Sequence, residues 1–127
     1  MKGVTYDTGA LIAADRNDRE MWALHAALLA LEVSPTVPTP VLAEAWRSGS
    51  RQASLTRFLA LCTTEPLTDE HARAVGVLAA RSGHDDIVDV TVVEGAIRRH
   101  DAVVTSNPNH IRKIADAARV RLTINNV

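Results

Sequence analysis

The chain has 127 residues, enough for a substantial core, and we expect a single domain over residues 1–127. Hydrophobic residues make up 46% of it, which excludes a disordered chain. The formal charge is −1, from 14 Lys and Arg against 15 Asp and Glu, so the total charge neither indicates nor excludes nucleic-acid binding. The single cysteine, Cys62, excludes an internal disulfide and a cysteine-rich zinc site.

The sequence shows neither a secretion signal nor a membrane-spanning segment. The start, MKGVTYDTGA, places an aspartate where a secretion signal needs its apolar segment. The longest uncharged apolar stretch, residues 21–31, is too short to cross a bilayer. We therefore expect a cytoplasmic protein.

Apolar periodicity and turn residues predict strands and helices that alternate along the chain. In chain order, the prediction is a strand at 2–6, helices at 8–14 and 19–32, an extended segment at 34–38, a helix from 39, a helix at 52–61, a strand at 62–66, helices at 69–81 and 86–100, a strand at 102–105, a helix from 107 to 118 and a strand at 121–124. This alternation predicts an α/β fold, a three-layer α/β/α sandwich with a central, mainly parallel sheet.

Several helix starts are marked by capping residues. Asp18 and Thr68 are predicted N-caps, and Thr39-Pro40 resembles an N-cap followed by a proline that starts a helix. The helix after Asp18 is expected to bury a wide apolar stripe. That stripe consists of Trp22, Leu24, Leu28, Leu29 and Leu31.

Three acidic residues stand where a parallel α/β fold places functional groups. Asp7 ends the first apolar run, and Glu44 lies one turn into the helix that Thr39-Pro40 opens. Asp89 shares a helix face with apolar positions three, four and seven residues later, so it is expected to be buried. Buried carboxylates are normally paired, metal-bound or protonated. Each acid alone also fits a plainer role, namely a helix cap for Asp7 and a solvated side chain for Glu44 or Asp89.

Carboxylates that converge on one point repel each other, and a hard cation with oxygen ligands relieves that repulsion. Mg²⁺ takes one or two carboxylates together with waters and phosphate oxygens. Such an ion can polarise a phosphoryl oxygen and activate a water for in-line attack. We therefore predict that Asp7, Glu44 and Asp89 hold Mg²⁺, with Mn²⁺ as a possible substitute. Asp86, one turn before Asp89, is interpreted first as a helix cap.

Other catalytic signatures are absent from the sequence. It contains no GxSxG, Walker A or GxGxxG pattern, and no HxxxH or HExxH spacing. The histidines are therefore interpreted as surface or core residues rather than as a competing metal site. These are His25, His71, His84, His100 and His110.

Three segments of the chain resemble PIN-domain proteins of the VapC toxin class. They are VTYDTGALIAADR near the start, VPTPVLAEAWR in the middle and DIVDVTVVEGAIRRHDAVVTSNPNHI near the end, in the order that the family has them. The resemblance implies a metal-dependent endoribonuclease with acids at the positions of Asp7, Glu44 and Asp89. It also implies an RNA substrate, Mg²⁺ or Mn²⁺ as the cofactor, a cognate antitoxin as the partner and a homodimer.

The chain departs from this family at Asn107. The family pattern after AVVTS carries a fourth acid, and here the position holds a neutral amide. Asn107 can hydrogen-bond a water on the metal or bind the metal weakly, and we count it with the catalytic residues. With Pro108 next to it, it is also a good N-cap. The missing charge puts a second metal in doubt more than the first.

The leading hypothesis is therefore a toxin of a type II toxin–antitoxin system that hydrolyses RNA phosphodiesters. The resemblance implies products with a 5′-phosphate and a 3′-hydroxyl. One alternative is a catalytically impaired PIN-fold regulatory or binding module that lacks the fourth acid. Another is a phospho-receiver in which Asp7 is phosphorylated, although the strand at 102–105 is followed by no nearby lysine. Arginines that could contact phosphates, or simply lie in solvent, are Arg47, Arg51, Arg57, Arg98, Arg99 and Arg112.

Overall fold

The computed structural model describes residues 3–127, and a five-stranded parallel sheet forms its centre. Every pair of neighbouring strands runs parallel, in the order β3-β2-β1-β4-β5. The longest pairing joins β1 to β4, from Gly3 opposite Asp101 to Tyr6 opposite Val104. The strands are β1 (Gly3–Tyr6), β2 (Thr36–Pro38), β3 (Thr63–Glu65), β4 (Asp101–Thr105) and β5 (Ile124–Asn126).

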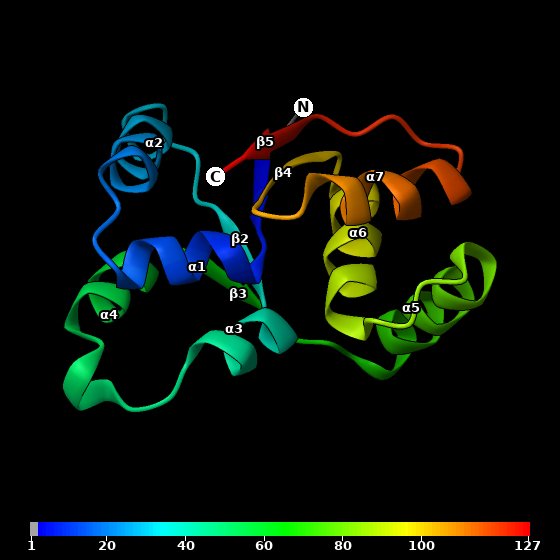
Figure 1. The fold of residues 1–127 in the computed structure, drawn as a ribbon, viewed down its shortest axis with the longest axis horizontal. Coiled ribbons are helices and arrows are strands. Elements are labelled where there is room, and N and C mark those ends of the chain that lie inside the picture. The colour runs from blue at the N-terminus through cyan, green and yellow to red at the C-terminus, as the bar shows by residue number, and fades with distance from the viewer. Residues whose placement is uncertain (1–2) are drawn as a thin grey trace.

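Helices cover both faces of this sheet. Figure 1 shows the sheet nearly edge-on, with α1, α2 and α4 on one side and α5, α6 and α7 on the other. The predicted three-layer α/β architecture is therefore confirmed. The helices are α1 (Thr8–Asp15), α2 (Arg19–Ala30), α3 (Thr39–Ala45), α4 (Ala53–Leu59), α5 (Asp69–Ser82), α6 (Ile87–Arg99) and α7 (Pro108–Ala117), with a short 3₁₀ turn, η1 (Gly49–Arg51), before α4.

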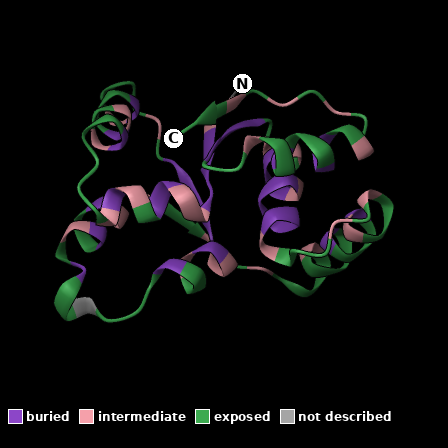
Figure 2. Cartoon of the chain, in the orientation of Figure 1, coloured by how far each residue is buried: buried purple, intermediate pink, exposed green. Residues whose placement is uncertain are grey.

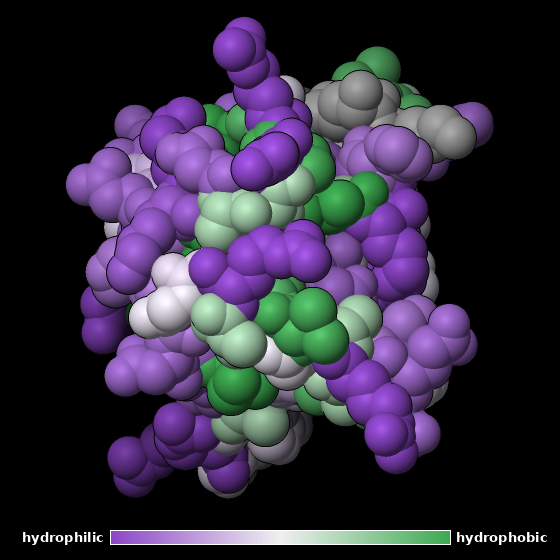
Figure 3. All heavy atoms as spheres, turned by 90° about the vertical axis from the view of Figure 1, so that its right-hand side faces the viewer, coloured by the Kyte–Doolittle hydropathy of each residue, from purple (hydrophilic) through white to green (hydrophobic). Residues whose placement is uncertain are grey.

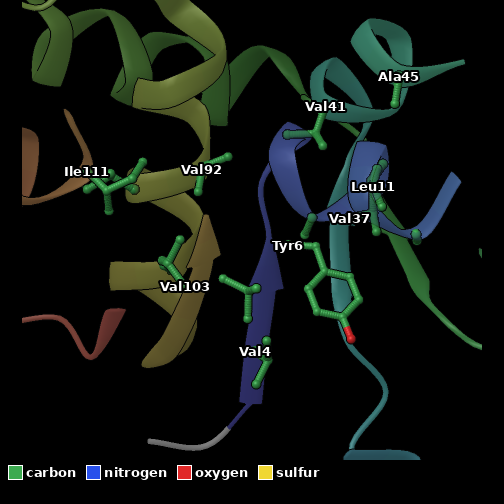
Figure 4. Packing of buried hydrophobic residues seen from close by; sticks show 14 of the residues in the cluster. Val4, Tyr6, Leu11, Val37, Val41, Ala45, Val92, Val103 and Ile111 are labelled. Atoms are coloured by element: carbon green, nitrogen blue, oxygen red, sulfur yellow. The ribbon is translucent and has the colours of Figure 1, made fainter. Parts of the chain in front are cut away.

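Strands β1 and β4, which pair at the middle of the sheet, are buried on both faces, as a covered parallel sheet requires. All five residues of β4 are buried, and so are the last three of β1. Figure 2 shows this buried centre, with the outer turns of the helices exposed. In Figure 4, Val92 and Ile111 pack on one side of β1 while Leu11 and Tyr6 lie on the other. The sheet thus separates two apolar layers and fixes the ends of β1 and β4 rigidly.

A buried aromatic cluster anchors α2 and α4 to β1. Phe58 is fully buried, and its ring centroid lies 3.9 Å from that of His25 and 5.2 Å from that of Tyr6. The Tyr6 hydroxyl is 2.8 Å from His25 Nδ1. Burial raises the pKa of Tyr6 and lowers the pKa of His25, so both groups are neutral at pH 7. Trp22 packs edge-on against Phe58.

The apolar face predicted for the second helix is confirmed in part, because Leu28 is buried and the half-buried Trp22 and Leu24 pack against the core. The structure buries Met21, His25 and Leu28 of α2, whereas Leu31 is 75% exposed. The reason is that His25 turns inward to meet Tyr6, and that α2 ends at Ala30. Residue 32, in the left-handed conformation, then leads the chain away.

Two further differences concern Thr39 and the last strand. Thr39 lies inside α3 rather than capping it, and its hydroxyl accepts a hydrogen bond from the Leu67 amide at 3.2 Å. The last strand begins at Ile124, where the prediction ended, because pairing with β4 selects residues 124–126. The first strand was predicted from Lys2, which lies outside the described residues.

The outer face of the α5–α7 layer carries both polar and apolar side chains (Figure 3). In Figure 3 the face formed by the α5–α7 side is hydrophilic at its edges, while hydrophobic side chains gather down its middle with hydrophilic ones crossing between them. Among the helices of residues 3–127, none has the length and apolar character needed to cross a membrane.

Candidate metal and active site

The four predicted site residues lie at the carboxyl edge of the sheet, beside the point where its strand order reverses. The chain runs from β1 outward through β2 to β3, and then returns to place β4 on the other side of β1. Ligands in parallel α/β folds bind at such a switch point, where the connections after neighbouring strands diverge. Asp7 directly follows β1, and Asn107 comes two residues after β4. The topology therefore brings residues 100 positions apart to one place.

Asp7 is buried and firmly held. It is 3% exposed, and its backbone amide donates to the Val104 carbonyl at 2.9 Å. The Thr8 amide donates to Asp7 Oδ1 and the Thr105 hydroxyl donates to Asp7 Oδ2, both at 2.7 Å. As predicted, Asp7 also caps α1. The cap and the inward carboxylate are thus the same arrangement, not alternatives.

The electrostatics of Asp7 show how close the other acids are. Burial is the main cause that raises the pKa of this carboxyl, and the hydrogen bonds from Thr105 and Thr8 oppose it. The negative charges of Asp89 and Glu44 raise the pKa further. The carboxylates of Asp7, Glu44 and Asp89 therefore repel one another, and a cation bound among them would stabilise the site.

Glu44 is joined to Asp7 through Thr8. The Thr8 hydroxyl donates to Glu44 Oε1 at 2.7 Å, while the amide of the same residue donates to Asp7. Glu44 is exposed and is the second-to-last residue of α3, so its carboxylate is accessible from solvent. Thr8 therefore positions two of the three predicted metal ligands.

Asp89 is 7% exposed, which excludes the solvated role that the sequence left open. It lies in the first turn of α6, and its helix-face neighbours Val92, Val93 and Ala96 are all fully buried, as expected from the spacing. Asp86 caps this helix, since its Oδ1 accepts hydrogen bonds from the amides of residues 88 and 89. The cap fixes the first turn and so the direction of Asp89.

One cleft of about 220 Å³ joins these groups. The amide side chain of Asn107 does not cap α7, although the residue stands at the N-cap position. Its backbone amide donates to the Thr105 hydroxyl, the same hydroxyl that holds Asp7. The cleft is lined by Asp7, Thr8, Gly9, Ile12, Glu44, Asp86, Asp89, Ser106, Asn107 and His110.

Gly9 permits the close approach of α1 to the loop after β4. A Cβ atom at residue 9 would lie 2.1 Å from Ser106 Oγ and 3.0 Å from the Ser106 backbone nitrogen. Any side chain there would therefore push the Ser106–Asn107 loop away from Asp7. The YDTG segment thus supplies a carboxylate, two hydrogen-bond donors and the space for the facing loop.

Two histidines beside Asp89 were missed by the sequence interpretation. Asp89 Oδ2 lies 3.0 Å from His84 Nε2 and 3.4 Å from His110 Nδ1. The interpretation of these two histidines as plain surface or core residues therefore missed their contact with Asp89. No short motif could have shown it, because His110 reaches Asp89 only through the packing of α7 against α6.

Two of the arginines considered for phosphate binding are held in ion pairs. Arg98 Nη2 and Arg99 Nη1 each lie 2.6 Å from Glu65 Oε1. Hydrogen bonding from Arg98 is the main cause that lowers the pKa of Glu65.

A larger cavity, of about 640 Å³, is lined by Arg112 but by none of the predicted site residues. The largest of the described cavities and the convergence of the predicted acids are therefore in different places.

Comparisons with known proteins support the fold. No protein-family model matches the chain, and neither does any curated protein sequence. Among solved structures, it is similar to a chain in the crystal structure of VapBC2 from Rickettsia felis bound to a DNA fragment from their promoter. The TM-score is 0.72 over 97% of each chain, at 18% sequence identity. At that identity the likeness establishes a shared α/β fold, consistent with the resemblance seen in the sequence.

Proposed function

We propose that the protein is a metal-dependent endoribonuclease toxin of the VapC type, acting on RNA phosphodiester bonds and neutralised by a cognate antitoxin. One observation carries this proposal. Asp7, Glu44, Asp89 and Asn107 come from four separate parts of the chain and line a single cleft at the carboxyl edge of the sheet. The fold shared with a chain of VapBC2 supports the toxin class.

The donor set fits a hard divalent cation. Asp7, Glu44 and Asp89 would hold Mg²⁺ or Mn²⁺, since carboxylate oxygens are the ligands that these ions prefer. When bound, the ion supplies Lewis-acid polarisation of a phosphoryl oxygen and an activated water. The raised pKa of Asp7 fits this assignment, because the repulsion from Asp89 and Glu44 that contributes to it is relieved by a positive charge.

The remaining residues of the cleft position the reacting groups. Thr105 and Thr8 hold the Asp7 carboxylate from both of its oxygens, so its direction is fixed before substrate arrives. The Asn107 amide can donate to a phosphate oxygen or orient a water without adding charge. Glu44, the exposed member of the set, lies where the cleft meets solvent and an RNA strand could enter.

The proposed partners follow from the same cleft. An antitoxin segment would cover the acidic groups, with a basic side chain placed among the carboxylates. The fold neighbour belongs to a complex named VapBC2, which supports a two-protein system for this chain as well. We propose a homodimer in the cytoplasm as the form of the toxin.

The proposal is tested with antitoxin-free protein and a mixed pool of small RNAs, incubated with Mg²⁺, Mn²⁺ or EDTA. Asp7→Asn is compared with Asp69→Asn, a change at an exposed acid on α5 that lies outside the cleft. We expect discrete fragments with either metal, none with EDTA, and loss of cleavage in Asp7→Asn alone. Folded protein that leaves the RNA intact with both metals would refute the nuclease assignment.

A second candidate function is a PIN-fold regulatory or binding module with impaired catalysis, and Asn107 is the observation that favours it. The test is Asn107→Asp, which supplies a fourth carboxylate at the edge of the cleft. If the wild-type protein is inactive and this variant cleaves RNA, the module assignment is correct. If the wild-type protein already cleaves RNA, and Asp7→Asn abolishes it, the module assignment fails.

A further inference from the structure

Three potential metal ligands from three segments meet at one side of the candidate site. His84 lies in the loop between α5 and α6, Asp89 in the first turn of α6, and His110 in α7. One ligand atom from each can be chosen so that all three lie within 4.8 Å of one another. The two imidazole rings are tilted by 60°, with centroids 5.3 Å apart. The rings therefore converge on the carboxylate without stacking on each other.

The spacing of these atoms matches the coordination of a small transition-metal ion. Zinc binds histidine nitrogen and carboxylate oxygen at about 2.0–2.2 Å, so neighbouring ligand atoms of a tetrahedron lie roughly 3.4 Å apart. Asp89 Oδ2 is 3.0 Å from His84 Nε2 and 3.4 Å from His110 Nδ1. Shifts of a few tenths of an ångström at side chains would complete the geometry at these two edges.

The surroundings favour binding from the cleft side. The side chains of His84 and Asp89 are each 10% exposed, whereas that of His110 is 57% exposed. His110 also lines the cleft that contains Asp7 and Glu44. An ion could thus enter from the cleft, meet two ligands that are already held, and keep a fourth position open to solvent.

We propose that His84, Asp89 and His110 form a binding site for a divalent transition-metal ion of the zinc class. This donor set differs from that of the proposed Mg²⁺ site, because two of its three ligands are imidazoles. Imidazole selects zinc and related ions over Mg²⁺, which prefers oxygen ligands. Asp89 is common to both sets. If the proposed nuclease function holds, an ion at this site withdraws Asp89 from the Mg²⁺ site and inhibits cleavage.

The site is tested by titrating Zn²⁺ into chelator-stripped full-length protein that carries no histidine tag, in excess Mg²⁺ and without RNA. Binding is measured by competition with a chromophoric chelator, and Co²⁺ is used to read the coordination from its visible spectrum. The variants are His110→Gln and the double variant His84→Gln/His110→Gln. The matched control is His100→Asn, which removes an exposed histidine that ends α6 in a left-handed conformation that asparagine also adopts.

We expect one equivalent of Zn²⁺ to bind the wild-type protein and His100→Asn equally. His110→Gln should weaken binding by at least about tenfold, and the double variant should lose it. Since His110 is exposed, His110→Gln keeps the test valid even if the double variant fails to fold. Absence of saturable binding, or equal binding by His110→Gln and wild type, would overturn the proposal.

These results separate the inference from the proposed function. Cleavage of RNA with Mg²⁺ by protein that binds no Zn²⁺ would remove only the zinc-class site. Zn²⁺ binding by a protein that never cleaves RNA would remove only the nuclease assignment.

Discussion

The hydroxyl of Thr105 is predicted to stabilise the buried charge of Asp7, and Thr105→Val tests this. Thr105 is fully buried, and its hydroxyl donates to Asp7 Oδ2 at 2.7 Å while it accepts from the Asn107 amide at 2.9 Å. A hydrogen bond to a charged group contributes about 1.5–3 kcal/mol, and an amide that loses its acceptor costs about 1 kcal/mol more. Valine has nearly the same shape, so little cavity is created.

We therefore expect Thr105→Val to lower the free energy of unfolding by about 3 kcal/mol, which lowers Tm by roughly 10 °C in a domain of this size. Asp7→Asn should act in the opposite direction. Because the pKa of Asp7 is raised in the folded protein, its contribution to stability is present at low pH and is lost as the pH rises through the folded-state pKa. At pH 7 the neutral amide should therefore stabilise the fold.

The double-mutant cycle of these two changes isolates the interaction between the hydroxyl and the charge. The loss of the acceptor for the Asn107 amide is common to both backgrounds and cancels in the cycle. In the Asp7→Asn background the hydroxyl makes a neutral hydrogen bond of about 0.5–1.5 kcal/mol in place of the charged one, so the two changes should couple by about 1 kcal/mol. Urea unfolding at pH 7 measures all four proteins. Thr91→Val is the matched control, since that buried hydroxyl donates to the Ile87 carbonyl within α6. Additivity within about 0.4 kcal/mol for Thr105, or equal coupling for Thr91, would show that the Thr105 hydroxyl does not stabilise the Asp7 charge.

Three further predictions concern the core and the cleft. Phe58→Ala should lower the free energy of unfolding in urea by about 3–5 kcal/mol, because it leaves a cavity in the buried cluster around Tyr6. A decrease of less than about 1 kcal/mol would contradict that packing. The burial-lowered pKa of His25 makes stability fall as the pH drops below about 6.5, and His25→Gln should remove this part of the pH dependence of unfolding, whereas an unchanged profile would contradict it. Gly9→Ala should displace Ser106, so we expect a larger relative loss in the rate of RNA cleavage than in Tm. An unchanged cleavage rate would show that the close approach is not needed.

The order of the elements and the positions of the acids could be predicted because both depend on local patterns. Parallel strands end at one edge of a sheet, so an acid that follows the first strand and a polar residue that follows the fourth were expected to meet. The structure brings Asp7 and Asn107 to the same cleft. The apolar spacing after Asp89 likewise predicted its burial. Whether these residues bind a metal stays a prediction.

What the sequence could not show depends on contacts between distant segments. His25 looked like one more position on α2, and only the buried Tyr6 hydroxyl explains why it turns inward. His110 reaches Asp89 because α7 packs on α6, and no spacing in the sequence encodes that contact. The last strand, β5, was misplaced because its own residues carry a weak pattern and its register is set by β4.

The central claim is that the acidic cleft catalyses metal-dependent cleavage of RNA. The most direct test is the initial cleavage rate of antitoxin-free protein on the small-RNA pool as Mg²⁺ is raised from a chelated baseline, for the wild-type protein and Asp89→Asn. We expect a rate that rises with Mg²⁺ and saturates, and that falls by about two orders of magnitude or more in Asp89→Asn. A rate that is independent of Mg²⁺, or that is equal in the two proteins, would contradict that claim.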